Sequence, residues 1–268
     1  MAETVSSKAT KDKQGTKKAS YLDRPWLKSY DPGVPADVDI PADQTFVDLL
    51  MEGFGQNPNR TALHFLGNAI TFRELDRMSR RFGRFLHDQG LSTGDVVAIN
   101  LPNVPQYLIA LIGAHRAGLA TTGVSVLLTP KELAYQLNDS GAKALVIMDQ
   151  LFEQNLVQVA DEVPGLKYVF HTSVGEFLPG HKRVLGNLLK KIPAGKTHGL
   201  PGKHVAPMAG VLASAPPFLP KIDIKPEDPC LIQYTGGTTG TPKGVVLTHG
   251  NVVANFTQAR HWTEFEMG

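Results

Sequence analysis

Short runs of residues that are apolar on both faces alternate along this chain with amphipathic helical segments. The apolar runs occupy residues 96–101, 120–124 and 144–148. Strands without a polar face are typical of parallel sheets that helices cover on both sides. The sequence therefore predicts an α/β fold with parallel or mixed sheets flanked by helices, connected by right-handed crossovers.

Two helix starts carry capping boxes, in which a Thr and a Glu three residues later satisfy each other's backbone N–H groups. Thr71 with Glu74 predicts one start, and Thr129 with Glu132 predicts another, with Pro130 at the first helical position. Periodicity predicts further helices from residue 45 onward and over 107–116, 151–163 and 251–262, and a short strand over 168–170.

Residues 182–192 combine apolar and basic side chains at helical spacing. The apolar members are Val184, Leu185, Leu188, Leu189 and Ile192, and the basic ones are Lys182, Arg183, Lys190 and Lys191. We expect a linker helix packed by its apolar face, and the alternative is a peripheral contact with a membrane surface. Residues 193–220, rich in Pro, Gly and Ala, predict a loop.

The formal net charge of +2 comes from the first twenty residues, which hold five Lys against Glu3 and Asp12. The rest of the chain is nearly neutral, so we expect no nucleic-acid partner. Residues 1–20 contain one Val and no aromatic residue, and we expect a disordered basic tail there. Residues 21–44, rich in Pro and Asp, predict an extended arm.

Cys230 is the only cysteine, which excludes a disulfide within this chain and fits a reducing, cytoplasmic setting. It lies in an apolar run that predicts a strand, with no His nearby in sequence. We therefore expect Cys230 to be a small buried hydrophobic residue and not a nucleophile. The nine His are scattered without a metal-ligand spacing, and no metal-ligating residue is predicted.

A loop rich in Gly and Thr, residues 234–244, follows the apolar run that contains Cys230. Glycines permit positive φ and a close approach of backbone N–H groups to an anion, and Lys243 adds a compact positive charge. The loop is not the common P-loop, because Lys243 precedes Gly244 and an apolar β-branched run follows. The sequence predicts a phosphate-binding loop between two strands, with a helix afterwards.

The string Tyr-Thr-Gly-Gly-Thr-Thr-Gly-Thr-Pro-Lys-Gly over 234–244, followed by Leu-Thr-His-Gly-Asn, closely resembles the signature of the adenylate-forming (AMP-binding) superfamily. Its form is most similar to that of long-chain fatty acyl-CoA synthetases. Arg116-Ala117-Gly118 and the stretch from Thr129 to Leu133 also fall in the family's order. The resemblance, over roughly 45–255, implies the N-terminal part of the adenylate-forming synthetase fold, with 45–268 as an incomplete AMP-binding domain.

By this resemblance, a fatty acid reacts with ATP to give an acyl-adenylate and pyrophosphate, and CoA then displaces AMP. ATP, Mg²⁺ and CoA are the implied cofactors and cosubstrates. The implied nucleotide contacts are Thr235, Gly236, Gly237, Thr238, Thr239 and Lys243. Lys243 and Thr239 are the implied catalytic residues, while Gly240 and Gly244 have conformational roles and Tyr234 packs at the strand end.

The family's later Thr-Glu motif, its ribose-binding Asp, its hinge and its C-terminal Lys have no counterpart in this sequence. We therefore expect the N-terminal half of an enzyme that is inactive alone. Two other functions stay open: an aryl- or amino-acid-adenylating enzyme of the same fold, and a non-catalytic nucleotide- or partner-binding fragment. A homodimer of the full-length enzyme and a peripheral location at the membrane also stay open.

Overall fold

The structure, a computed structural model, describes residues 23–189, 191–236 and 240–263. The expected disordered tail, residues 1–20, lies outside the described residues. The chain divides into two compact units. The larger is Pro41–Ala254, and the smaller joins Met1–Ile40 to Asn255–Gly268.

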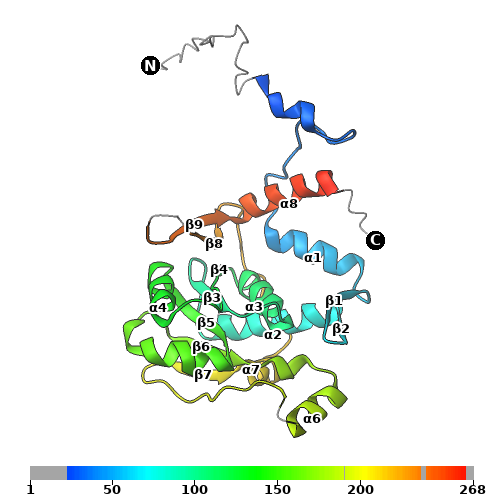
Figure 1. Cartoon of the computed structure of the whole chain (residues 1–268). Coiled ribbons are helices and arrows are strands. Elements are labelled where there is room, and N and C mark those ends of the chain that lie inside the picture. Colours follow the sequence, from blue (N-terminus) through cyan, green and yellow to red (C-terminus); the bar gives the residue numbers. More distant parts are fainter. Residues whose placement is uncertain (1–22, 190, 237–239, 264–268) are drawn as a thin grey trace. The chain divides into compact units, whose positions relative to one another are not determined.

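The larger unit contains a seven-stranded sheet in the order β7-β6-β5-β3-β4-β8-β9 (Figure 1). The strands are β3 (Val96–Asn100), β4 (Ala120–Gly123), β5 (Ala142–Met148), β6 (Tyr168–Thr172), β7 (His204–Pro207), β8 (Pro229–Thr235) and β9 (Lys243–Thr248). Neighbouring strands are parallel except for β9, which pairs with β8 in the antiparallel direction. The sheet is thus mixed and nearly all parallel, and the predicted α/β class is confirmed.

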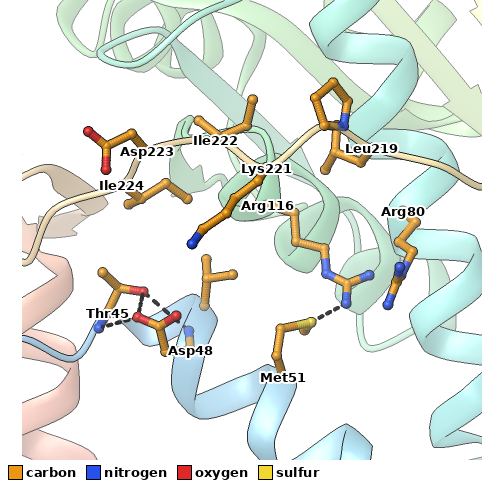
Figure 2. A pocket seen from close by; sticks show the side chains of 12 residues that line it. Thr45, Asp48, Met51, Arg80, Arg116, Leu219, Lys221, Ile222, Asp223 and Ile224 are labelled. Atoms are coloured by element: carbon orange, nitrogen blue, oxygen red, sulfur yellow. Dashed lines mark hydrogen bonds between the residues drawn. The ribbon is translucent and has the colours of Figure 1, made fainter.

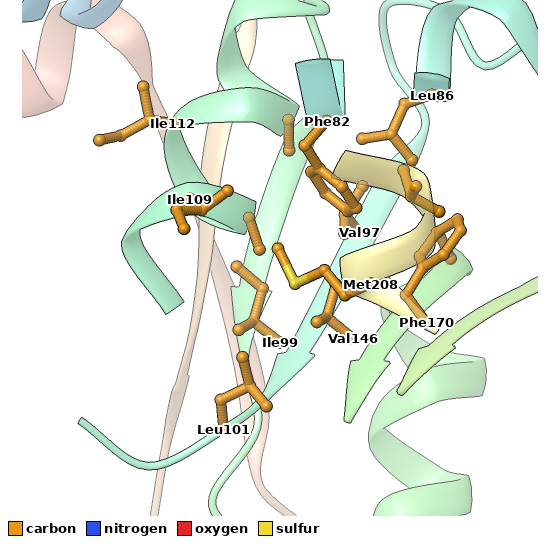
Figure 3. Close-up of a cluster of buried hydrophobic side chains, with 14 of the residues drawn as sticks. Phe82, Leu86, Val97, Ile99, Leu101, Ile109, Ile112, Val146, Phe170 and Met208 are labelled. Carbon is orange, nitrogen blue, oxygen red and sulfur yellow. The ribbon is translucent and has the colours of Figure 1, made fainter. Parts of the chain in front are cut away.

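Alternate residues of the central strands enter two separate hydrophobic cores. Val97, Ile99 and Val146 belong to one core, and Ala98, Leu145 and Ile147 belong to the other. Figure 3 shows the first core, where the rings of Phe82 and Phe170 meet edge to face at 5.4 Å. Burying a large apolar side chain of this kind contributes about 1.5–3 kcal/mol to stability. The sheet is therefore covered on both faces, as strands without a polar face require.

The first core is covered by α2 (Phe72–Asp88), α3 (Pro105–Arg116) and α7 (Met208–Ser214), and the second by α4 (Pro130–Asp139). Helices α2 and α3 approach closely because each places a glycine at the contact. A Cβ on Gly83 would lie 2.5 Å from the Gly113 carbonyl oxygen, and one on Gly113 would lie 2.8 Å from the Ser79 carbonyl oxygen. A larger residue at either position would force the helices apart.

The predicted helix starts are confirmed. Thr71–Glu74 and Thr129–Glu132 form complete capping boxes at the starts of α2 and α4. A third box, Thr45 with Asp48, opens α1 (Phe46–Gln56). A two-stranded hairpin that the sequence reasoning missed, β1 (Thr61–Phe65) and β2 (Asn68–Thr71), lies between α1 and α2.

The helix expected over 107–116 and the strand expected over 168–170 are confirmed as α3 and β6, but two other expectations need correction. The helix expected over 151–163 is an irregular succession of α5 (Asp149–Leu151), a π-helical segment (Phe152–Leu156) and a 3-10 segment (Val157–Glu162). The loop expected over 193–220 contains β7 and α7, because Met208 and Val211 find a place in the first core. Such short elements, of four and seven residues, leave little periodicity in a sequence.

The expectation of a packed linker helix at 182–192 is also wrong. A helix does form there, α6 (Gly180–Leu188), but its apolar side chains face solvent. Val184, Leu185 and Leu188 are 68%, 56% and 77% exposed.

The smaller unit contains a 3-10 helix (Pro25–Ser29) in the segment expected to be an extended arm. Arg24 forms an ion pair with Asp37 at 2.8 Å, and the rings of Tyr30 and Trp262 meet at 4.7 Å. Trp262 belongs to α8 (His249–Thr263), whose first turns lie in the larger unit. Among the described residues, no helix is both long enough and apolar enough to cross a membrane.

Candidate functional site

The Gly- and Thr-rich loop connects two antiparallel strands, as the sequence predicts. Thr235 is the last residue of β8 and pairs with Lys243, the first residue of β9. Both are exposed. Gly236 follows Thr235 and is exposed too, whereas Gly237, Thr238 and Thr239 lie outside the described residues. The structure thus brings Thr235, Gly236 and Lys243 together at the base of the loop.

Gly244 is needed for space and not for positive φ. A Cβ on Gly244 would lie 2.8 Å from Ile232 Cγ2 and 3.0 Å from Tyr234 Cζ, on the partner strand. Gly236 and Gly240 have open space around them, and none of the three adopts a positive φ. The expectation of positive φ is therefore wrong at these three glycines, and among the described glycines of the loop a steric demand exists only at Gly244.

Two tyrosines attach the base of the loop to α4. The Tyr234 hydroxyl donates to Asp139 Oδ2 at 2.6 Å, and the Tyr135 hydroxyl donates to the Pro242 carbonyl oxygen at 2.8 Å. Burial and the neighbouring Asp139 carboxylate raise the pKa of Tyr234 well above its usual range, which keeps the phenol protonated as a donor. Tyr135 and Asp139 lie about a hundred positions from the loop, and no sequence signal pointed to this attachment.

A cavity of about 560 Å³ lies beside the loop. It is lined by Gly123, Ser125, Leu128, Lys131, Glu132, Tyr135, Gln136, Gln233, Tyr234, Gly236, Thr241 and Pro242. Gly123 ends β4 and Tyr234 lies near the end of β8, so the cavity opens at the carboxyl ends of two adjacent parallel strands. Ligands of open α/β sheets bind at this edge.

Side-chain hydrogen bonds join α4, β4 and β8 at the cavity floor. Gln136 donates to the Gly123 carbonyl oxygen at 2.9 Å and to Thr122 Oγ1 at 3.2 Å. Thr122 in turn donates to the Ile232 carbonyl oxygen of β8 at 2.9 Å. These bonds are buried or partly buried, so they hold the cavity floor in one arrangement.

Two lysines offer uncompensated charge at this site. In the described part of the chain, the side chains of Lys131 and Lys243 form no hydrogen bond or ion pair, and both residues are exposed. Glu132, which lines the cavity, is engaged in its capping box, and Asp139 is engaged with Tyr234. The arrangement therefore favours an anionic ligand with several oxygens.

A second cavity, of about 470 Å³, is lined mainly by the start of α1 and residues 219–224, with Arg80 of α2 and Arg116 of α3 (Figure 2). Its guanidinium groups are not free. Arg116 is bonded to Asp76, to Met51 Sδ and to Ser79, and Arg80 forms an ion pair with Asp76 at 3.1 Å. Because both guanidinium groups are engaged with Asp76, and because the carboxylates of Asp48 and Asp223 also line this cavity, it is less suited to a polyphosphate than the one beside the loop.

The sequence profile of a family described as AMP-binding enzyme matches residues 51–268, well over half of the chain. The chain belongs to the AMP-binding enzyme family. A long-chain-fatty-acid–CoA ligase from Escherichia coli O157:H7 is 37% identical over 239 residues, which cover 87% of this chain and 42% of that protein. A 4-coumarate–CoA ligase 2 from Nicotiana tabacum is 31% identical over 189 residues, 70% of this chain and 29% of that protein.

A solved structure of a long-chain-fatty-acid-CoA ligase from Archaeoglobus fulgidus has the same fold, with a TM-score of 0.67 at 23% identity. The match covers 88% of this chain and 42% of that one. This AMP-binding family member thus spans about two fifths of the length of the long-chain ligases that it matches. The family resemblance inferred from the loop is confirmed.

Proposed function

We propose that this chain supplies the phosphate-holding part of an ATP-dependent fatty-acid-activating enzyme, a long-chain fatty acid–CoA ligase. The observation that carries the proposal is the pair Thr235 and Lys243. They lie opposite each other at the base of the loop, exposed and beside a cavity at the carboxyl ends of β4 and β8. The fatty acid branch is supported by the higher identity, 37% against 31%, to the long-chain ligase.

In this proposal, Thr235, Gly236, Gly237, Thr238, Thr239 and Lys243 hold the β- and γ-phosphates of ATP. A fatty carboxylate oxygen attacks the α-phosphorus, the bond from that phosphorus to the bridging oxygen breaks, and pyrophosphate leaves. Lys243 and Thr239 stabilise the charge that collects on pyrophosphate. No general base is needed, because the carboxylate is already ionised at neutral pH.

The charged groups at the cavity fit a Mg²⁺-bound triphosphate. The described carboxylates at the cavity are engaged with other groups, whereas the two lysines are free of such bonds in the described residues. Mg²⁺, when bound with the nucleotide, supplies further positive charge at the phosphate oxygens. The chain's own task is to position those oxygens on a base that Tyr234 and Tyr135 fix to α4.

The decisive test measures the binding of Mg²⁺-ATP to this chain by calorimetry. We expect Lys243→Ala to weaken binding at least tenfold, because a charge-assisted contact to phosphate is lost. Lys167→Ala, an exposed lysine away from the loop, is the matched control and should leave binding unchanged. Equal affinities for Lys243→Ala and the parent chain would contradict the proposal.

Two other functions remain in the proposal as alternatives, and both keep the same phosphate site. One is activation of an aryl or amino acid, and the other is nucleotide or partner binding without catalysis. In each case the tail (1–20) and the arm (21–44) would precede residues 45–268. Residues 45–268 would act as part of an AMP-binding domain. Pyrophosphate release with fatty acids, aromatic acids and amino acids, measured on this chain and on a version extended to the relatives' length, separates the three.

A second observation favours a peripheral contact of this enzyme with the cytoplasmic face of a membrane. The exposed apolar side chains Val184, Leu185, Leu188 and Leu189 lie on or next to α6, among Lys182, Arg183 and Lys191. Apolar insertion together with about 1 kcal/mol for each basic residue near an anionic surface supports such binding.

Vesicle co-sedimentation tests the contact. We expect Leu185→Ser with Leu188→Ser to abolish binding to vesicles of anionic phospholipid. Lys191→Glu should weaken binding to anionic vesicles, and the parent chain should bind neutral vesicles weakly. If the double serine variant sedimented with the vesicles as well as the parent does, α6 would not be the contact.

A further inference from the structure

Two histidines and the single cysteine meet inside the larger unit, far from one another in sequence. His115 lies in the last turn of α3, Cys230 near the start of β8, and His249 is the first residue of α8. One donor atom from each lies within 4.8 Å of the other two. All three side chains are buried, at most 1% exposed. The wide spacing along the chain explains why the sequence predicted no such cluster.

The hydrogen bonding of the cluster is incomplete. Both ring nitrogens of His249 are buried without a hydrogen-bond partner in the described part of the chain. A buried polar atom without a partner destabilises the folded chain and calls for an explanation. A ligand between the three side chains would satisfy one of these nitrogens.

The tautomer of His115 is fixed by its surroundings. Its Nδ1 lies 3.2 Å from the Leu119 carbonyl oxygen, which can only accept, so Nδ1 carries the hydrogen. The lone pair is therefore on Nε2, which lies 3.9 Å from Cys230 Sγ. Metal-ligating histidines usually have this arrangement, with the other ring nitrogen donating to a carbonyl or carboxylate.

We propose that His115 Nε2, Cys230 Sγ and one ring nitrogen of His249 bind a thiophilic metal ion, with three-coordinate Cu(I) as the preferred occupant. Two imidazoles and a thiolate are ligands that soft and borderline ions select. Metal–sulfur and metal–nitrogen bonds of about 2.3 and about 2.05 Å place sulfur and nitrogen about 3.8 Å apart in trigonal geometry and about 3.6 Å apart in tetrahedral geometry. In the metal-free chain, Cys230 Sγ lies 3.9 Å from His115 Nε2 and 3.8 Å from Nδ1, and the three ligand atoms lie within 4.8 Å of one another, so a metal would bind after small side-chain rotations.

The charge balance also favours a monovalent ion. Binding removes the proton from the Cys230 thiol and releases it to solvent, and the sulfur then donates an electron pair to the metal. A thiolate with Cu(I) is neutral, whereas a thiolate with Zn²⁺ leaves one positive charge in a buried site, which is costly. The nearby carboxylates are engaged, Asp48 with Thr45 and Asp228 with the Lys225 backbone N–H.

A neighbouring aromatic ring shields the cluster. The Phe46 ring meets the His115 ring edge to face at 5.5 Å and shields it. Thr45 and Asp48, on either side of Phe46 in sequence, line the cavity in Figure 2 together with Arg116, which follows His115. In the metal-free chain, the Thr121 hydroxyl lies 3.4 Å from His115 Nε2 and donates to it, so a metal ion would displace this hydrogen bond.

The cluster is separate from the phosphate site. Cys230 lies near the amino end of β8 and Thr235 at its carboxyl end, about 17 Å apart at about 3.3 Å per residue. A metal here would join α3, β8 and the first residue of α8, the helix that directly follows β9. The metal would therefore stabilise the packing of the elements that carry the loop. This role does not depend on the proposed ATP site.

The test uses the tag-free, metal-free chain under anaerobic conditions, titrated with Cu(I) in competition with a chromophoric chelator. We expect one equivalent to bind, with an affinity that rises with pH because a proton is released. Cys230→Ser and His249→Gln should each lower the affinity at least tenfold, and His171→Gln, a half-buried histidine outside the cluster, should not. Absence of stoichiometric binding, or the same affinity in Cys230→Ser, would overturn the proposal.

A parallel titration with Co(II), and then Zn(II), identifies the coordination. Cys230 is the only cysteine, so sulfur-to-cobalt charge-transfer absorption reports this thiolate alone. Tight Zn(II) binding without Cu(I) binding would overturn the three-coordinate monovalent assignment. If a variant fails to fold, the thermal midpoint of the parent chain with and without Cu(I) gives the answer: a rise supports the site and no change overturns it.

Discussion

The hydroxyl of Tyr234 donates to the carboxylate of Asp139 at 2.6 Å and so joins the end of β8 to the last residue of α4. The signature of the family contains the tyrosine, but its partner lies 95 residues earlier. The contact fixes one side of the loop base, and Tyr135 with the Pro242 carbonyl fixes the other.

Tyr234→Phe removes this attachment without creating a large cavity. We expect the free energy of unfolding to fall by about 1 kcal/mol, the net value of a hydrogen bond. We also expect ATP to bind more weakly. Tyr168→Phe is the control, because its hydroxyl donates to the Gln89 carbonyl oxygen at 2.9 Å, away from the loop. Urea unfolding and calorimetry should show a stability loss in both variants and an affinity loss only in the first.

Gly244→Ala and Gly240→Ala form a matched pair within one loop. The added Cβ at 244 would overlap Ile232 and Tyr234, whereas the one at 240 meets open space. We expect Gly244→Ala to lower the free energy of unfolding by about 1–3 kcal/mol, the usual cost of overpacking. Gly240→Ala should have almost no effect. Equal stabilities in a urea titration would mean that the β8–β9 contact is looser than described.

Lys131→Ala tests whether the cavity itself holds phosphate charge. Lys131 lines the cavity and has no ion-pair partner in the described residues. We expect ATP affinity to fall severalfold at low ionic strength and the difference to shrink in high salt, where the Debye length falls to about 3 Å at 1 M. Lys167→Ala is again the control. A Lys131→Ala variant with parental affinity at both salt concentrations would place the phosphates elsewhere.

Acid should destabilise the metal-free chain through the buried histidine pair. Burial, with a smaller contribution from the neighbouring His249, lowers the pKa of His115 to about 3, and burial also lowers the pKa of His249. The unfolded chain therefore binds more protons than the folded chain between pH ~6.5 and pH ~3, so stability falls as pH falls through this window.

The measurement is the free energy of unfolding in urea at several pH values. In His115→Gln, this free energy should depend less steeply on pH, while His204→Gln, at an exposed position, should keep the parental slope. The remaining slope would come from His249 and from carboxylates. Parallel curves for His115→Gln and the parent chain would exclude His115 as the group responsible.

Features set by local sequence could be predicted. The capping boxes at Thr71 and Thr129 need only residues three apart, and the apolar strands need only their own composition. The strand–loop–strand course around Lys243 also follows from local residue order. Elements β7 and α7 could not be predicted, because Met208 and Val211 are ordered by a core built from distant helices and strands.

For the candidate site, the loop was recognisable and its surroundings were not. Thr235, Gly236 and Lys243 form a contiguous motif, whereas Tyr135, Asp139 and Lys131 come from α4 and are brought near only by the sheet order β4-β8-β9. The His115–Cys230–His249 cluster has the same origin, since its members come from three elements. The exposed apolar face of α6 was misjudged because periodicity gives the face but not what covers it.

Strand β9 ends the order of the described sheet, and its Val245 and Val246 are 47% and 54% exposed. An apolar edge strand presents unpaired backbone donors and acceptors that another strand can join. Any polypeptide segment that added to this edge would lengthen the sheet and cover both valines. Exposed apolar edges of this kind favour self-association, so we expect the chain to associate more as its concentration rises.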